Sequence, residues 1–147
     1  MGERVPRRPA VILADDHPRT LAAASELMRK DYEVVATVGD GASALDAVAR
    51  LNPDVVVLDI AMPGANGFET ARRIREGGLP TRIVFLTITE DWDYVFAASR
   101  LGASYVLKRR ICTDLVPAVR EALAGRHFIS PMEPVSVSKS QVFGIGY

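Results

Sequence analysis

Short apolar runs alternate along this chain with amphipathic stretches of helical period. Apolar runs rich in β-branched residues predict strands near 10–14, 33–38, 54–59, 82–87 and 104–107. Apolar side chains spaced three and four residues apart predict helices over 18–30, 41–51, 66–76, 91–101 and 114–124. Because a proline fits the first turn of a helix but not its middle, Pro117 places the start of the last helix near Thr113 or Asp114.

Five repeats of strand and helix predict an α/β fold with a five-stranded parallel sheet and helices on both faces. Inside the strands predicted at 54–59 and 82–87, the runs 55–58 and 83–86 are wholly apolar, as strands covered on both faces are. Right-handed crossovers leave few topologies, and the flavodoxin-like (βα)5 order 2-1-3-4-5 is the usual one at this length.

The repeating pattern covers residues 9–125, which we predict to form one domain. Residues 1–8 are expected to be a disordered N-terminal arm, since they precede the first apolar run. Residues 126–147 contain prolines, serines and glycines without a helical period, which is typical of a linker or tail.

Four of the apolar runs end in a residue that can take part in chemistry. Asp15-Asp16, Asp59, Thr87 and Lys108 each close one run, and parallel strands bring such ends to one edge of the sheet. Three carboxylates that converge repel each other unless a cation lies among them, and oxygen ligands favour Mg²⁺ over Zn²⁺. Each residue also has an ordinary role, the acids and the threonine as helix caps and the lysine as a solvated edge residue.

The amine and the hydroxyl favour phosphoryl transfer at this edge. Lys108 can offset the charge on phosphoryl oxygens, and the Thr87 hydroxyl can donate a hydrogen bond to one of them. An ionised Asp59 can attack phosphorus in line and form an acyl phosphate.

Composition excludes several classes of protein. The chain has 147 residues, 48% of them apolar, with 18 basic residues balanced by 18 acidic ones, so its charge favours neither nucleic acid nor a membrane surface. No apolar run is long enough for a transmembrane helix. The lone Cys112 excludes an internal disulfide and favours a cytoplasmic location.

Four motifs in order resemble the response-regulator receiver domain of two-component signalling, the CheY-like family. They are 13–17 (Leu-Ala-Asp-Asp-His), 57–64 (Val-Leu-Asp-Ile-Ala-Met-Pro-Gly), 86–87 (Leu-Thr) and 102–108 (Gly-Ala-Ser-Tyr-Val-Leu-Lys). The chain is most similar to the receivers of LuxR/NarL-type regulators, and the resemblance spans nearly all of residues 9–125. It implies a protein that accepts a phosphoryl group from a sensor histidine kinase or a phosphotransfer protein and changes conformation to control an output.

The resemblance also implies roles for individual residues. Asp59 would be the phosphoacceptor. Asp15, Asp16, Asp59 and the backbone carbonyl of Ala61 would hold Mg²⁺, with Mn²⁺ as an alternative. The chain would not be an enzyme in the usual sense, since it would catalyse only its own Mg²⁺-dependent phosphorylation and dephosphorylation.

The remaining implied roles concern the phosphoryl oxygens and the conformational switch. Thr87 and Lys108 would bind the phosphoryl oxygens, and Tyr105 would turn inward when Thr87 moves. Tyr105 could instead be an ordinary strand tyrosine. His17 follows the acid pair, and a helix-start role is favoured over a chemical one.

Three features bear on subfamily and partners. Arg109-Arg110 follows Lys108 where many receivers have proline, so the conformation of that loop stays open. Trp92 and Phe96 lie four residues apart on the fourth predicted helix, either packed beneath a loop or exposed on the face formed by helix 4, strand 5 and helix 5, through which receivers form homodimers. No DNA-binding domain is expected in these residues, although a longer parent transcription factor could carry one. A natural single-domain regulator is the other possibility, and the parent protein is favoured.

Two other classes of function compete with the signalling switch. A phosphohydrolase of the haloacid-dehalogenase type also forms an aspartyl phosphate, but it needs an acid two residues after the nucleophile, where this chain has Ala61. A receiver that no longer accepts phosphate would act only as a binding module, and the complete set of site residues argues against it.

Overall fold

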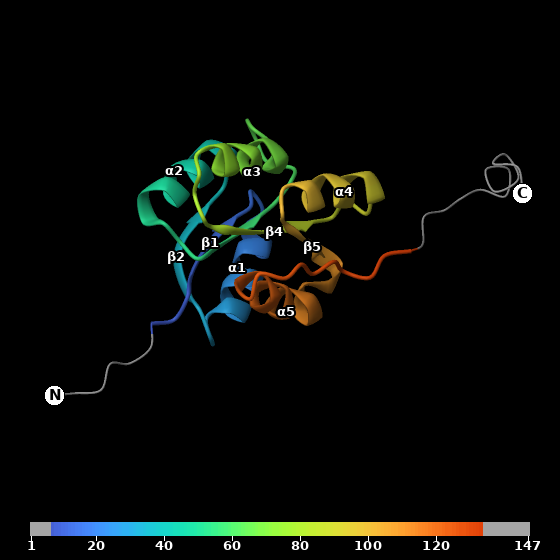
Figure 1. Ribbon diagram of the computed structural model, residues 1–147. Helices are drawn as coiled ribbons and strands as arrows, with labels where there is room; N and C mark the ends of the chain where they lie inside the picture. Colours follow the sequence, from blue (N-terminus) through green and yellow to red (C-terminus); the bar gives the residue numbers. More distant parts are fainter. Residues whose placement is uncertain (1–6, 134–147) are drawn as a thin grey trace, which may run out of the picture.

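Five parallel strands form the single sheet of this protein, in the order β2-β1-β3-β4-β5. Figure 1 shows the computed structural model, which describes residues 7–133. The strands are β1 (Ala10–Ala14), β2 (Glu33–Val38), β3 (Val55–Leu58), β4 (Arg82–Thr87) and β5 (Ser104–Leu107). The predicted α/β class and strand order are therefore confirmed.

Helices cover both faces of the sheet. They are α1 (Pro18–Met28), α2 (Gly41–Leu51), α3 (Gly67–Glu76), α4 (Trp92–Arg100) and α5 (Ile111–Leu123), with a short 3₁₀ turn, η1 (Lys108–Arg110), before α5. Helices α1 and α5 lie on one face, and α2, α3 and α4 lie on the other (Figure 1). None of the helices in the described part of the chain is long and apolar enough to span a membrane.

Strand β3 explains why the central apolar runs do not alternate with polar residues. Val55 and Val57 pack in the core beneath α1 and α5, whereas Val56 and Leu58 pack in the core on the opposite face. All four residues of the strand are buried. A strand with helices on both sides therefore needs an apolar side chain at every position.

The predicted start of the last helix was wrong. Helix α5 begins at Ile111, directly after the 3₁₀ turn, so Pro117 lies inside the helix rather than in its first turn. A proline there cannot donate a hydrogen bond to the carbonyl of Thr113. Thr113 is exposed, so water can satisfy that carbonyl.

The first residues after α5 pair with the outer edge of β5. The Tyr105 amide donates to the Phe128 carbonyl at 2.8 Å, and the Ser130 amide donates to the Tyr105 carbonyl at 2.8 Å. The buried Ser130 hydroxyl accepts from the Leu107 amide at 3.1 Å and donates to Asp114 Oδ2 at 2.7 Å. Residues 126–133, which we call the β5 strap, therefore run along β5 on their way out of the domain (Figure 1, orange to red).

Ser130→Ala is expected to lower the free energy of unfolding by about 1–2 kcal/mol, because the buried Leu107 amide loses its acceptor and Asp114 loses one of its donors. Urea denaturation measures the change. Ser99→Ala on the exposed surface of α4 is the matched control and should shift stability by less than about 0.5 kcal/mol. Equal stabilities for the two variants would contradict the docking of the β5 strap.

Candidate functional site

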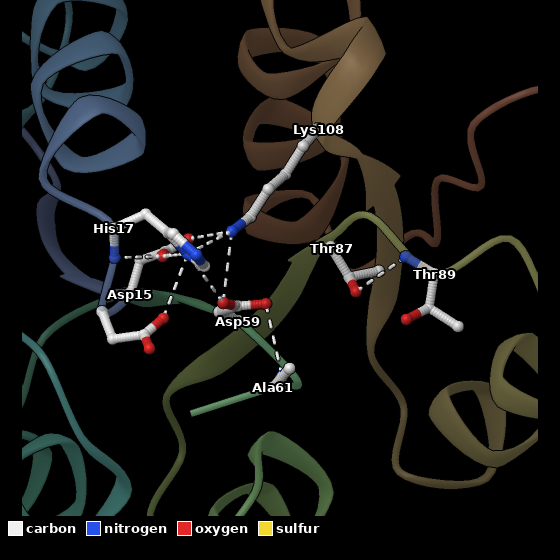
Figure 2. Close-up of polar contacts among 8 residues, drawn as sticks. Asp15, His17, Asp59, Ala61, Thr87, Thr89 and Lys108 are labelled. Carbon is white, nitrogen blue, oxygen red and sulfur yellow. Dashed lines mark hydrogen bonds and ion pairs between the residues drawn. The ribbon is translucent and has the colours of Figure 1, made fainter. Parts of the chain in front are cut away.

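The register of the sheet brings the predicted acids and lysine together. Ala14 at the end of β1 pairs with Leu58 at the end of β3, so Asp15 and Asp59 leave the sheet side by side. The Asp59 amide donates to the Ala14 carbonyl at 2.9 Å, which extends this pairing by one residue. Lys108 follows β5 and reaches across the sheet edge toward both carboxylates (Figure 2).

One ammonium group faces two buried carboxylates. Lys108 Nζ lies 2.7 Å from Asp15 Oδ2 and 3.2 Å from Asp59 Oδ2. Asp15 is 3% exposed and Asp59 is 2% exposed, so neither charge is well hydrated. The Lys108 ammonium is the charged partner of Asp15 Oδ2, and no other described residue donates to that oxygen. One ammonium is thus shared by two buried carboxylates, so the site would accommodate a further positive charge.

Burial raises the pKa of Asp59, and the negative charge of Asp15 raises it further, whereas Lys108 acts in the opposite direction. The Ala61 amide is a weak additional donor to Asp59 Oδ1, at 3.4 Å. A cation bound among the carboxylates would offset both effects, lower the pKa of Asp59 and hold the residue in its ionised form.

The carboxylate cluster contains a histidine that sequence reasoning assigned to the start of a helix. One ligand atom from each of Asp15, Asp16, His17 and Asp59 lies within 4.8 Å of the others. His17 Nδ1 is 3.0 Å from Asp15 Oδ1 and 3.1 Å from Asp16 Oδ1 (Figure 2). The signal in the sequence was only its place after the acid pair, which could not tell a helix-start residue from a site residue.

Thr87 and Tyr105 both bind the backbone of one residue, Thr89, rather than the acids. The Thr87 hydroxyl accepts from the Thr89 amide at 3.1 Å, and the Tyr105 hydroxyl donates to the Thr89 carbonyl at 2.6 Å. Burial raises the pKa of Tyr105, and the nearby Asp91 carboxylate raises it further, so its hydroxyl remains a donor. Thr89 thus links Thr87, at the end of β4, to the buried Tyr105 on β5.

Tyr105→Phe is expected to lower the free energy of unfolding by about 1 kcal/mol, because the Thr89 carbonyl loses its donor. Chemical denaturation followed by circular dichroism measures it. Tyr94→Phe removes a hydroxyl from a tyrosine that is 38% exposed and should have almost no effect. A similar loss in both variants would show that the bond to Thr89 contributes nothing.

Gly67 allows α3 to begin directly against the end of β3. A Cβ atom at this position would lie 2.3 Å from the Asp59 carbonyl oxygen and 2.7 Å from Ile60 Cα. The Gly67 amide donates to the Ile60 carbonyl at 2.8 Å. Gly67 is therefore a packing residue, which lets the backbone of α3 lie directly against the residues Asp59 and Ile60.

Arg109 occupies the position after the lysine where many receivers have proline. It lies in the 3₁₀ turn η1 and forms a two-pronged ion pair with Glu90, with Nε 2.8 Å from Oε2 and Nη2 2.9 Å from Oε1. This pair connects the loop after β5 to the loop after β4, close to Thr89. The loop whose conformation the sequence left open is thus a 3₁₀ turn that a surface ion pair links to the loop after β4.

A family profile and several known proteins match this chain. The response regulator receiver domain matches residues 11–120. The nitrate/nitrite response regulator protein NarP of Escherichia coli is 35% identical over 137 residues, and the oxygen regulatory protein NreC of Staphylococcus carnosus is 34% identical over 140 residues. The matches cover 91% and 92% of this chain but only 64% of each of these two relatives.

Solved structures agree with the sequence matches. The receiver domain of NarL from Mycobacterium tuberculosis superposes with a TM-score of 0.78 at 30% identity, over 82% of this chain and 100% of that chain. The receiver of RcsB from Salmonella enterica serovar Typhimurium, solved with the phosphomimetic BeF₃⁻, gives 0.77 at 27% identity over 90% of this chain and 98% of that chain. With the fold, the acid cluster and the profile match in agreement, this chain belongs to the response regulator receiver domain family.

Proposed function

We propose that this receiver accepts a phosphoryl group on Asp59 from the phosphohistidine of a sensor histidine kinase or a phosphotransfer protein. The observation that carries the proposal is the convergence of the Asp15 and Asp59 carboxylates on the Lys108 ammonium. An Asp59 oxygen forms a bond to phosphorus as the phosphorus–nitrogen bond of the phosphohistidine breaks, and the imidazole leaves with its electron pair.

Mg²⁺ is the cation that the site fits best, with Mn²⁺ as an alternative. The residues that would hold it are Asp15, Asp16, Asp59 and the carbonyl of Ala61, and the clustering of carboxylate oxygens from the three acids within 4.8 Å supports this fit. The bound cation would neutralise charge on the phosphoryl oxygens. Lys108 would bind one of those oxygens, exchanging part of its contact with Asp59 for the new anion.

Phosphorylation would be reported through Thr87, Thr89 and Tyr105. A phosphoryl oxygen is a strong acceptor, so it would draw the Thr87 hydroxyl away from the Thr89 amide, and the Thr89 carbonyl would carry the change to Tyr105. The switch would shift a population of conformers rather than create a new fold.

A phosphohydrolase is disfavoured by the residue two positions after Asp59. Ala61 is exposed and has no carboxyl group, so it cannot protonate a leaving group or activate water. The chain would therefore act as a regulator that catalyses only its own Mg²⁺-dependent phosphorylation and autodephosphorylation.

We propose a wider setting for the domain, which its relatives support. Residues 9–125 would be the receiver, residues 1–8 an N-terminal arm and residues 126–147 a linker or tail, in a cytoplasmic protein. A longer parent transcription factor would bind DNA and regulate transcription. NarP and NreC are named as regulators, and this chain spans 64% of each. Residues 1–6 and 134–147 lie outside the described part of the chain.

A homodimer through α4, β5 and α5 would use a face that the β5 strap partly covers. Tyr105 of β5 already pairs with Phe128 and Ser130 of the strap. The Trp92 indole donates to the Glu133 carbonyl at 3.0 Å, whereas Phe96 is 58% exposed. Any dimer on this face would therefore contact Phe96 and the strap rather than the backbone of β5.

The test is incubation with acetyl phosphate and Mg²⁺, followed by intact mass spectrometry and by assay of released phosphate. We expect one phosphoryl adduct per chain, with formation lost when the cation is chelated. Rapid multiple-turnover release of phosphate from small phosphate esters would favour a hydrolase. The absence of an adduct with both acetyl phosphate and a phosphorylated histidine donor would favour a binding module.

A further inference from the structure

The loop between β4 and α4, residues 88–91, contains the residue that contacts both Thr87 and Tyr105. The Thr89 amide donates to the Thr87 hydroxyl at 3.1 Å (Figure 2), and the Thr89 carbonyl accepts from the Tyr105 hydroxyl at 2.6 Å. Ile88, the first residue of the loop, is 73% exposed, so its side chain adds no apolar packing that would hold the loop. The position of Thr89 therefore depends on polar contacts.

Glu90, the next residue of the loop, is bound to the turn that follows β5. Its two carboxylate oxygens lie 2.8 Å and 2.9 Å from Nε and Nη2 of Arg109. The hydrogen bond from Arg109 lowers the pKa of Glu90, so the carboxylate is ionised at neutral pH. Two parallel bonds between planar groups fix the orientation of both groups as well as their distance. This ion pair therefore restricts where the loop can lie.

The arginine of the pair belongs to a rigid part of the domain. Arg109 lies in η1, which continues without a break into α5. Leu115 and Val119 of α5 are completely buried in the core beneath the sheet. A helix packed in this way cannot follow a movement of the loop without disturbing the core. Any displacement of Glu90 is therefore a displacement relative to Arg109.

Thr89 and Glu90 are neighbours in the chain, so their positions are coupled. If the Thr87 hydroxyl turns toward a phosphoryl oxygen, the Thr89 amide keeps its acceptor only if the loop follows. Consecutive Cα atoms are about 3.8 Å apart, so a loop that follows carries Glu90 away from Arg109. Either the amide loses its acceptor or the ion pair is broken, and both consequences favour the unphosphorylated conformer.

We propose that the Glu90–Arg109 ion pair restrains the switch in its unphosphorylated conformer and thereby weakens the binding of a phosphoryl group at Asp59. The side chains of Arg109 and Glu90 are 52% and 38% exposed, so both charges can return to water when the pair breaks. The pair therefore shifts the balance between two conformers by a modest factor and does not lock one of them. The inference rests on the proposed function and adds to it the residues that set this balance.

The test measures the dissociation constant of BeF₃⁻, an analogue of the phosphoryl group, at saturating Mg²⁺ by fluorine NMR, which detects the bound fluorides directly. Arg109→Met and Glu90→Met each remove one charge and its hydrogen bonds. We expect each variant to bind BeF₃⁻ about two- to fivefold more tightly than the unmodified chain, the range for loss of an exposed ion pair. The double variant should show no further gain, because either single change already breaks the pair.

Arg50→Met is the matched control, because it breaks an exposed ion pair with Asp46 on α2 and should leave the dissociation constant unchanged. Charge alone predicts a different pattern for the two test variants. Loss of the positive charge in Arg109→Met would weaken binding of an anion, whereas loss of the negative charge in Glu90→Met would strengthen it. Tighter binding in both variants therefore reports the broken link between the loops.

The outcomes separate this inference from the proposed function. Opposite changes in the two variants, unchanged binding in either, or weaker binding in both would overturn the restraint while leaving the phosphoryl site intact. A further gain in the double variant would overturn it as well, because the two residues would then act independently. Failure of the unmodified chain and of both variants to bind BeF₃⁻ would refute the proposed function, and the restraint with it.

Discussion

Asp59→Asn is expected to take up no phosphoryl group from acetyl phosphate under conditions that phosphorylate the unmodified chain completely. An amide lacks the anionic oxygen that must bond to phosphorus, and no other acid in the cluster has the same relation to Lys108 and the end of β3. The fold should persist, since asparagine has the same shape. Intact mass spectrometry gives the result directly.

Asp46→Asn is the matched control, because Asp46 is an exposed acid on α2 whose side chain is 73% exposed. It should be phosphorylated as fully as the unmodified chain. An adduct on Asp59→Asn of the same yield would move the phosphoacceptor to Asp15 or Asp16 and would contradict the proposed function.

Asp59→Asn should also make the chain more stable than the unmodified chain at neutral pH when metal is chelated. Burial and the charge of Asp15 raise the pKa of Asp59 in the folded state above its ordinary value of 3.8. The protonated side chain therefore contributes stability below pH 3.8, and this contribution is lost as the pH rises through the pKa of the folded state. Asparagine removes this loss, which is on the order of 1 kcal/mol for each pKa unit. Urea denaturation at neutral pH should show the gain, and at acid pH the two chains should converge.

Lys108→Met is expected to cause the largest loss of stability, about 3 kcal/mol in chelator at neutral pH. It removes the one ammonium between two buried carboxylates, and breaking a buried ion pair on one side leaves an uncompensated charge. Methionine keeps most of the side-chain volume, so the loss reports charge rather than packing. Urea denaturation with chelator measures the difference.

Added Mg²⁺ should restore part of that loss, because a cation that binds the folded chain stabilises it by mass action. Lys30→Met makes the same change of charge at an exposed position on the surface and should cost less than about 0.5 kcal/mol. If Lys108→Met were as stable as Lys30→Met, the two carboxylates would have to be neutral or hydrated, and the electrostatic account of the site would be wrong.

The sheet could be predicted because it depends on the spacing of apolar residues along the chain. Most of the site could be predicted because its residues directly follow the strands. The apolar run 55–58 identified a strand buried on both faces, and the polar residues that follow such strands had to meet at one sheet edge. The start of α5 could not be read in this way. The 3₁₀ turn η1 is followed directly by the helix, which therefore begins at Ile111, before the predicted start. The prediction assumed that Pro117 lies in the first turn of the helix, whereas it lies inside the helix.

Contacts that depend on three-dimensional approach were also beyond the sequence. The acid pair predicted a cation site, but it did not predict that the His17 ring contacts the carboxylates of Asp15 and Asp16. Likewise, residues 126–133 have the composition of a linker, and their pairing with β5 comes from single polar contacts such as Ser130 with Asp114. No periodicity in the sequence records a contact of this kind.

The β5 strap also determines where this domain can safely be divided from whatever follows it. Burial alone would raise the pKa of Asp114, but hydrogen bonds from Arg110, Ser130 and Thr113 outweigh that effect and lower it, so the strap is anchored by an ionised group. A cut after Gly125 would bare the amides of Tyr105 and Leu107 along an outer strand, where a second chain could add its own strand. The β5 strap, whose composition is that of a linker, thus covers the edge of the sheet and protects it from pairing with a strand of another chain.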